Sequence, residues 1–272
     1  NKELHKTLTG MHFRRVKSEH GLYARHDDNG KMTAMLAAAT DDLAIAFPKP
    51  GDKKSIVKSL EKHYQLNDLG DLSWIVGMRV TRDRANLKTT IDQQAYTEKI
   101  LENYGGRKEQ KWAPMKTPFN SDKKHKLHKD MSPRTPEEKD LMKNVPYRSA
   151  IGALMYLTVA TRPDIACSTA TSARYMTNPG QEHWTSVKRA FRYLQGNLTL
   201  GLVFDCSTNC DILECFSDSD WAADQDGRRS TTGYTVYLYG CAISWKSKLQ
   251  KTVAHSSTEA EYYAMSDTAR EV

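Results

Sequence analysis

A basic, proline-containing stretch divides the chain and limits how each half can fold. Residues 107–130 hold eight lysines and arginines against three acids, which leaves a net charge of +5. With few apolar side chains, such a segment is typical of a connector rather than of a packed core. Hydrophobic residues make up 39% of the 272 positions, enough for folded cores on both sides. We therefore predict folded regions joined by this connector, which continues through Pro133 and Pro136.

The region before the connector has strand and helix patterns. Two apolar runs flank an acidic pair in Met35–Phe47, which predicts two buried strands joined by a tight turn, with a helix as the alternative for the alanines. A helix is expected from about Asp52, and a hairpin over residues 72–91. Asp92 can cap the next helix, and Gly105 and Gly106 supply its stop signal.

After the connector, helical spacing gives way to strands. Apolar residues from Tyr147 to Leu194 predict three helices, the second begun by Pro163. A last helix is expected from about Ser256, and its pattern still continues at Val272. Between them, short β-branched or aromatic runs predict strands at Leu202–Phe204, Ile212–Phe216, Tyr234–Tyr239 and Ala242–Trp245. The predicted fold class is α/β (α+β).

Charge and cysteine content narrow the functional class. A formal net charge of +7 suits a polyanionic partner such as nucleic acid, although many basic proteins bind none. Cys206, Cys210 and Cys215 cluster, but zinc would need a fourth ligand and no histidine is near, so strand packing is the simpler interpretation. The odd total of five cysteines is unlike a secreted disulfide framework.

The sequence has no pattern of a targeting or membrane-spanning segment, which favours an intracellular protein. The chain begins without an apolar targeting segment, and its longest apolar run, residues 151–160, is too short to span a bilayer. We therefore expect no membrane association and no secretion, with the cytoplasm and the nucleus as the compartments.

An acidic pair before the connector is a candidate metal site. Asp41 and Asp42 lie between apolar runs, where a turn can bring both carboxylates to one tip. Two ionised carboxylates this close repel each other, so a hard cation such as Mg²⁺ is their natural partner. From spacing alone, a solvated turn is the simpler interpretation.

A second set of acids lies in the strand-rich region. Asp218 follows the predicted strand Ile212–Phe216, and Glu261 lies on the final helix. A strand end and a helix packed on the same sheet could bring these carboxylates together, as a magnesium-dependent nuclease site requires. Asp220 and Asp224 are further candidates. From spacing alone, unrelated surface acids are the simpler interpretation.

The motifs between Thr40 and Leu194 resemble those of copia-type retrotransposon polyproteins. Thr40-Asp41-Asp42 resembles the paired-aspartate motif of a polymerase palm, and Leu69–Met78 looks like the hairpin that follows it. Two departures are Ala39, where the usual motif has an aromatic residue, and Thr40, which replaces a hydrophobic one. The copia-like connector motifs are Tyr147–Leu157, Thr161–Ile165, His183, Lys188-Arg189 and Arg192–Leu194.

The remaining motifs resemble the ribonuclease H of the same family, and all motifs occur in the family's order. They are Ser217–Ala222, Arg228–Tyr234, Ser244–Lys248 and Ser256–Tyr262. Together the resemblance covers nearly the whole chain. It implies a partial reverse-transcriptase palm over residues 1–105, a basic linker and helical connector over 106–198, and a truncated ribonuclease H-like mixed sheet over 199–272.

The resemblance also implies roles for the four carboxylates. Asp41 and Asp42 correspond to polymerase metal ligands, and Asp218 and Glu261 to the first two ribonuclease H carboxylates, all binding Mg²⁺. Glu259 corresponds to a helix-surface neighbour. By the resemblance, an earlier palm aspartate should lie upstream of residue 1 and two further ribonuclease H carboxylates beyond residue 272. We therefore expect no catalysis from this chain alone.

The implied function of the parent is RNA-directed DNA synthesis with degradation of the RNA strand. Its partners would be an RNA template, a DNA primer and an RNA–DNA hybrid. The phosphates would be contacted by Lys111, Lys116, Lys188, Arg189 and Arg192. A solvated linker and helix face is the alternative for these basic residues. A catalytically silent remnant that binds nucleic acid or a protein partner is the alternative for the chain.

Overall fold

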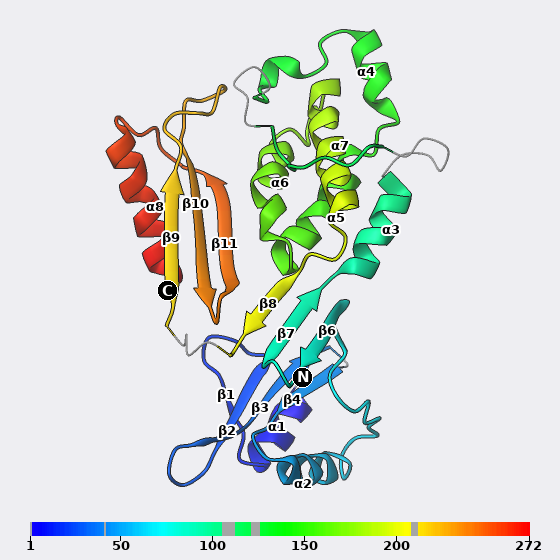
Figure 1. Cartoon of the computed structure of the whole chain (residues 1–272), viewed down its shortest axis with the longest axis vertical. Coiled ribbons are helices and arrows are strands. Elements are labelled where there is room, and N and C mark those ends of the chain that lie inside the picture. The colour runs from blue at the N-terminus through cyan, green and yellow to red at the C-terminus, as the bar shows by residue number, and fades with distance from the viewer. Residues whose placement is uncertain (1, 41, 105–111, 121–125, 208–211) are drawn as a thin grey trace. The chain divides into compact units, whose positions relative to one another are not determined.

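The computed structural model describes residues 2–40, 42–104, 112–120, 126–207 and 212–272 (Figure 1). The chain forms two compact units, residues 1–78 and 79–272. Five residues with a predicted role lie outside the described residues: Asp41, Gly105, Gly106, Lys111 and Cys210. The three predicted segments, 1–105, 106–198 and 199–272, stay a prediction.

The first unit is a four-stranded antiparallel sheet with two helices. The strand order is β1 (Arg14–Arg15), β2 (Leu22–His26), β3 (Met32–Ala39) and β4 (Asp42–Ala46). The helices are α1 (Lys2–Gly10) and α2 (Pro50–Leu60), and a short strand, β5 (Trp74–Ile75), follows. Leu8 of α1 and Ile56 and Leu60 of α2 pack with Tyr23 and Leu36 of the sheet in one buried core.

The predicted strands around the acidic pair are present. Met35 pairs with Ala46 and Ala39 pairs with Asp42, so β3 and β4 form a hairpin. The helix expected from Asp52 begins two residues earlier, where Pro50 occupies the first turn. Sequence patterning missed α1, β1 and β2, because the first thirty residues are polar and show neither period clearly.

The second unit begins with antiparallel strands that neighbour one another in the order β6, β7, β8. These strands are β6 (Met78–Asp83), β7 (Lys88–Asp92) and β8 (Leu202–Asp205). The predicted hairpin is therefore present, but its first strand does not run unbroken from Leu72. Val76 and Gly77 both have positive φ, at 48° and 74°, which interrupts an extended strand.

Helices form the middle of the second unit (Figure 1). They are α3 (Gln94–Tyr104), η2 (Lys129–Met131), α4 (Pro136–Lys143), α5 (Tyr147–Ala160), η3 (Pro163–Ile165), α6 (Ala166–Ala173) and α7 (Gln181–Gly196). α5 and α7 supply most of a buried core that includes Leu154, Leu157, Phe191 and Leu194. The three predicted helices of this region are thus confirmed.

Helix α4 corrects the expectation of a continuous connector around Pro133 and Pro136. Thr135 Oγ1 accepts a hydrogen bond from Glu138 N at 3.3 Å, and Thr135 N donates to Glu138 Oε2 at 3.2 Å. This reciprocal pair is a capping box, which satisfies two backbone donors at the start of the helix. The signal was present in the sequence as Thr-Pro-Glu-Glu.

A further antiparallel sheet, of three strands, and a helix complete the second unit. The sheet order is β9 (Glu214–Ser219), β10 (Thr231–Leu238) and β11 (Cys241–Leu249), followed by α8 (Ser257–Glu271). Ala260 and Ala264 of α8 are fully buried, and the alternate residues Thr232, Tyr234 and Val236 of β10 are buried too. β9 begins two residues later and ends three residues later than predicted, so Asp218 lies inside the strand rather than after it. Among the described helices, none is long and apolar enough to cross a membrane.

Candidate metal and nucleic-acid sites

Asp42 stands at the start of β4, on the exposed end of the β3–β4 hairpin. Its side chain is exposed to solvent. Thr40, which follows β3, has a positive φ of 52°, as expected where a chain reverses tightly. Because Asp41 is outside the described residues, the geometry of the predicted pair is not described. Asp42 therefore lies at the exposed start of a strand rather than in the buried core.

Glu261 of α8 contacts the end of β9, the strand that contains Asp218. Glu261 Oε1 accepts a hydrogen bond at 3.3 Å from Ser219 N, the residue that follows Asp218. Asp218 is exposed and Glu261 is half-buried. Ser219 Oγ, beside this bond, is buried without a hydrogen-bond partner. The end of β9 therefore places a helix carboxylate against the backbone of Ser219, near an unsatisfied hydroxyl and one residue along the strand from the exposed Asp218.

The start of α8 sets the place of Glu261. Ser256 Oγ caps the helix by accepting from Glu259 N at 3.1 Å, and His255 N donates to Glu259 Oε2 at 2.7 Å. Gln250 Nε2 donates to Ala260 O at 3.0 Å, which joins the end of β11 to the first turn of α8. The Glu259 carboxylate therefore accepts a hydrogen bond at the start of α8, whereas the Glu261 carboxylate accepts one from β9.

The two further acidic candidates have structural partners. Asp220 Oδ1 accepts a hydrogen bond from Thr231 N and so closes the connection between β9 and β10. The side chain of Asp224 is 1% exposed and is paired with Arg174. These contacts explain both acids without a metal ion. Asp218 and Glu261 are left as the acids at this strand end whose carboxylates could reach a ligand.

The donor set is incomplete for a metal ion. Within the described parts of the chain, no group of three or more His, Cys, Asp or Glu side chains could hold one. Asp218 and Glu261 offer the hard oxygen atoms that Mg²⁺ prefers, but only from two residues. The described residues therefore make part of a metal site at most.

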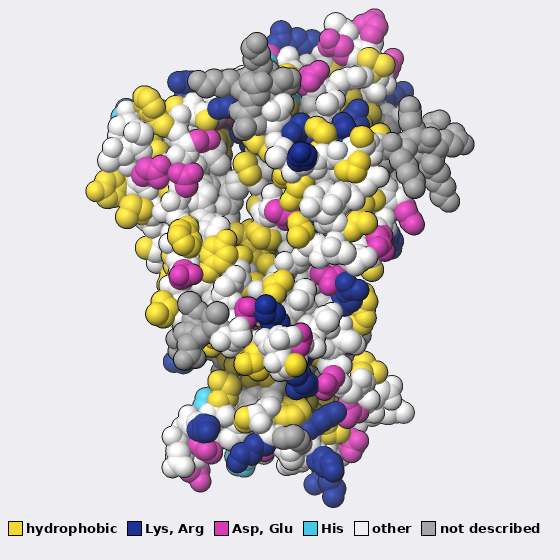
Figure 2. Space-filling model, viewed as in Figure 1, with side chains coloured by type: hydrophobic (Ala, Val, Ile, Leu, Met, Phe, Trp, Pro, Cys, Tyr) yellow, Lys and Arg dark blue, Asp and Glu magenta, His cyan; other side chains and the backbone are white. Residues whose placement is uncertain are grey.

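Two of the basic residues predicted to contact phosphate hold another segment in place. Arg189 Nη2 donates to Thr117 Oγ1 at 2.7 Å, and Arg192 Nε donates to Ala113 O at 2.7 Å. Both arginines thus tie residues 113–117 to α7, though each guanidinium has further donors. Lys116 is exposed and Lys188 is half-buried. On the face shown in Figure 2, Lys and Arg are interspersed with Asp and Glu rather than gathered in one patch.

Arg162 is a buried residue whose role the spacing of the sequence did not reveal. Its side chain is 2% exposed, and its guanidinium donates to both oxygens of Asp164 and to Asn197 O at 2.9 Å. The ring of Tyr193 lies 5.9 Å from its guanidinium carbon. The Thr-Arg-Pro-Asp motif therefore joins the end of α5 to the end of α7. The spacing of Arg162 and Asp164, two residues apart, was the signal in the sequence that could have indicated their ion pair.

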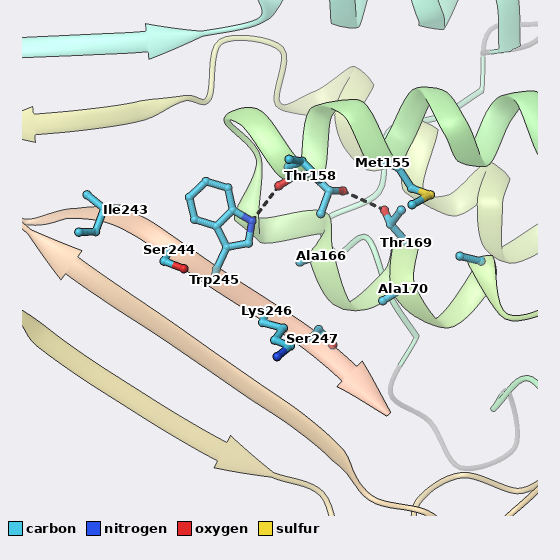
Figure 3. A pocket seen from close by; sticks show the side chains of 12 residues that line it. Met155, Thr158, Ala166, Thr169, Ala170, Ile243, Ser244, Trp245, Lys246 and Ser247 are labelled. Carbon is cyan, nitrogen blue, oxygen red and sulfur yellow. Dashed lines mark hydrogen bonds between the residues drawn. The ribbon is translucent and has the colours of Figure 1, made fainter. Parts of the chain in front are cut away.

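A cavity of about 340 Å³ lies where α5 and α6 face β11 (Figure 3). Trp245 Nε1 donates to Thr158 O at 2.7 Å and so bridges the strand to α5. Most of the other lining side chains are alanine or larger apolar residues such as Met155 and Ile243. No carboxylate or histidine lines this cavity, so we do not count it among the candidate catalytic sites.

Comparisons with known proteins identify the family. A family model for reverse transcriptase (RNA-dependent DNA polymerase) matches residues 1–117. The chain is 40% identical over 250 residues to the retrovirus-related Pol polyprotein from transposon TNT 1-94 of Nicotiana tabacum, covering 92% of this chain but 18% of that protein. This chain thus spans less than a fifth of that polyprotein.

Two shorter relatives are covered almost completely. The chain is 35% identical over 239 residues to an uncharacterized mitochondrial protein of Arabidopsis thaliana, covering 87% of this chain and 92% of that protein. It is 48% identical over 130 residues to secreted RxLR effector protein 161 of Plasmopara viticola, covering 48% and 91%. No solved structure matches the chain. The chain belongs to the family of copia-type retrotransposon Pol polyproteins, and it includes part of a reverse transcriptase.

Proposed function

We propose that this chain contributes ligands to two magnesium-dependent sites of a complete retroelement polyprotein. Asp41 and Asp42 belong to the site of RNA-directed DNA synthesis. Asp218 and Glu261 belong to the site that cleaves the RNA strand of an RNA–DNA hybrid. The reverse-transcriptase match over residues 1–117 supports the first assignment. The hydrogen bond from Ser219 N to Glu261 Oε1 is the observation that carries the second.

The chemistry of phosphoryl transfer explains why carboxylates are the residues of interest. Two magnesium ions held by acids stabilise the attacking and leaving oxygens of a phosphodiester. Because the chain spans 18% of the transposon TNT 1-94 polyprotein, we assign the remaining ligands to other parts of the parent. In this proposal the chain contributes part of each site, and other parts of the parent complete it.

The partners in this proposal are an RNA template, a DNA primer and an RNA–DNA hybrid. The net charge of +7 favours association with their phosphates. Lys111, Lys116, Lys188, Arg189 and Arg192 are the proposed contacts. We place the parent inside the cell, in the cytoplasm or nucleus, where such templates and products occur.

Substitutions in the full parent polyprotein separate the two sites. Asp41→Asn should abolish primer extension on an RNA template and leave hybrid cleavage intact. Asp218→Asn and Glu261→Gln should abolish hybrid cleavage and leave primer extension intact. Glu259→Gln, two residues away on α8 but on a different face of the helix, is the matched control and should retain both activities. Hybrid cleavage that survives both Asp218→Asn and Glu261→Gln would refute the ribonuclease H assignment.

A second function is a catalytically silent nucleic-acid-binding protein. The incomplete donor set among the described residues, together with the charge of +7, favours it. In either case the chain itself should bind an RNA–DNA hybrid with strong salt dependence. Lys116→Ala and Lys188→Ala should each lower the slope of log K against log salt by about 0.7–0.9.

The salt experiment has its own control and its own failure. Lys139→Ala on the exposed face of α4 should leave the slope unchanged. Binding that is insensitive to salt, or no binding at low salt, contradicts both functions. Salt-sensitive binding combined with a parent that extends no primer and cleaves no hybrid favours the silent protein.

A further inference from the structure

The segment after Asp218 is fastened to the helical connector by ionic contacts. Residues 220–230 connect β9 to β10. Arg174, directly after α6, donates a hydrogen bond to Asp224, and its Nη2 lies 3.8 Å from Asp226 Oδ2. The side chain of Asp224 is 1% exposed and that of Arg174 is 27% exposed. This pair is therefore shielded from water, unlike a solvated surface ion pair.

The other side of the segment is held from the linker and from α7. Lys129 N donates to Asp226 Oδ1 at 2.7 Å. The Tyr175 hydroxyl lies within hydrogen-bond distance of both Leu127 O, at 2.8 Å, and Asp226 Oδ2, at 3.2 Å. The fully buried ring of His183 stacks on Tyr175 with the centroids 4.1 Å apart. Three stretches of chain that are distant in sequence thus converge on Asp224 and Asp226.

The ionised state of Asp224 is stabilised by Arg174. Burial acts to raise the pKa of Asp224, but the hydrogen bond and charge of Arg174 and the N–H of Gly227 outweigh it and hold the pKa below its usual value. Without Arg174, Asp224 would lose the ion-pair partner that it has among the described residues and become the costly half of a broken buried pair.

Hydrogen bonds carry the position of Asp224 back to the strand end. Gly227 N donates to Asp224 Oδ2 at 2.8 Å, and Arg228 N donates to Asp224 O at 2.9 Å, so Asp224 shapes the turn around itself. Asp224 N in turn donates to Arg229 O at 3.2 Å. Asp220, which accepts from Thr231 N, ends this small network two residues after Asp218.

A second contact joins the same two layers. Trp245 on β11 donates to Thr158 O of α5, at the edge of the cavity in Figure 3. The connector therefore meets the sheet at β11 and again at the segment between β9 and β10. Two contacts of this kind restrict rotation of the sheet against the helices more than either could alone.

We propose that Arg174 is a positioning residue for the ribonuclease H carboxylates. Through Asp224 and Asp226 it holds residues 220–230 against the connector, and so fixes the end of β9, which carries Asp218 and the Ser219 N–H that Glu261 binds. The inference rests on the proposed function, because it takes Asp218 and Glu261 as ribonuclease H ligands. It adds that the helical connector is required for that site to have its working geometry.

Amide hydrogen exchange of the whole chain tests the positioning directly. In Arg174→Met, the amides of Ser219, Gly227 and Arg228 should exchange about tenfold faster or more, as expected when a contact of this kind is lost. Amides of the α5 and α7 core should be unchanged. Arg148→Met, at an exposed arginine on α5, is the matched control and should exchange like the parent chain. Unchanged exchange at Ser219 in Arg174→Met overturns the proposal.

A double variant covers the case in which the buried charge of Asp224 prevents folding. Arg174→Met with Asp224→Asn removes both charges, and the asparagine oxygen can still accept from Gly227 N. This variant should fold and still show fast exchange at Ser219. Exchange at Ser219 that equals the parent chain would mean that Arg174 only neutralises Asp224, and the positioning role would be wrong.

Kinetics of the complete polyprotein supply a readout that a merely structural role would not move. Arg174→Met should lower kcat for hybrid cleavage about tenfold, leave KM for the hybrid unchanged, and leave primer extension unchanged. Equal kcat overturns the positioning role. If the unsubstituted polyprotein cleaves no hybrid, the proposed function fails by itself, and exchange at Ser219 still decides whether Arg174 holds the strand end.

Discussion

In the first unit the predicted acid Asp42 stands on an exposed hairpin end, whereas in the second unit the acids near the end of β9 are surrounded by hydrogen bonds. Asp42 only begins a strand. Asp220 and Asp224 close turns, and Glu261 holds the backbone of Ser219. An acid on an exposed turn can be replaced without loss of structure, whereas acids in a network serve the fold and the site together. The function of the second set must therefore be separated from its structural part by experiment.

Core truncations should show the largest effects and should stay within their own units. The side chains of Leu36 in the first unit and Leu154 in the second are both buried, with at most 1% of their surface exposed. Leu36→Ala and Leu154→Ala should each lower the free energy of unfolding by about 2–5 kcal/mol. Amide exchange should quicken in β2–β4 only for Leu36→Ala, and in α5–α7 only for Leu154→Ala. Equal acceleration in both units by either variant would show that the units unfold as one.

A pair of arginines sharpens the comparison at the next level. Arg162 in the second unit is buried with Asp164 and Asn197, whereas Arg15 in the first unit is exposed and donates to the Tyr23 hydroxyl. Arg162→Met should cost about 3 kcal/mol in denaturant unfolding, because it removes one partner of a buried pair. Arg15→Met should cost less than about 1 kcal/mol. Similar costs for both would contradict the buried role of Arg162.

Acid should destabilise the second unit through His183. Burial has the largest effect and lowers the pKa of His183 from the usual 6.5. The hydrogen bond to His128 O and the charges of Asp226 and Glu182 act to raise this pKa, and the charge of His128 acts to lower it. Gly180 N donates to Nδ1, so Nε2 carries the proton and donates to His128 O. Because the unfolded chain binds a proton first, this stability is complete above pH 6.5 and is lost as the pH falls through the folded-state pKa.

The measurement for His183 is amide exchange in α7 as a function of pH, corrected for the intrinsic rate. His183→Gln should flatten the dependence below pH 6.5, whereas His5→Gln in the first unit should leave it unchanged. A slope in α7 that persists in His183→Gln would assign the acid sensitivity to another group.

The predicted metal ligands should show the smallest effects on stability. Asp42→Asn and Asp218→Asn, both at exposed side chains, should change the free energy of unfolding by no more than about 0.5 kcal/mol. Asp224→Ala, a neighbouring acid in the same sheet connection, should cost about 3 kcal/mol because it leaves Arg174 without its buried partner. Chemical denaturation of each variant provides the measurement. A large loss for Asp218→Asn would mean that this acid is structural.

Local patterns predicted the elements whose information is close in sequence. The apolar runs around the acidic pair, the helix after Pro163 and the last helix from about Ser256 each need only a few neighbouring residues, and each is present. The hairpin strand from Leu72 failed because the positive φ values of Val76 and Gly77 are not visible in apolar spacing. The start of α4 was readable as a capping box, so that miss was one of interpretation rather than of missing information.

The sequence by itself determined which acids are candidate ligands and where the three helices between Tyr147 and Leu194 lie, since residue type and local spacing predict both. Only the tertiary structure decided what each acid does. β8 was grouped with the last strands by proximity along the chain but pairs with β7, and Asp224 is buried against Arg174, fifty positions away. Burial and partners depend on contacts between residues far apart in sequence, and a single sequence carries no direct signal for them.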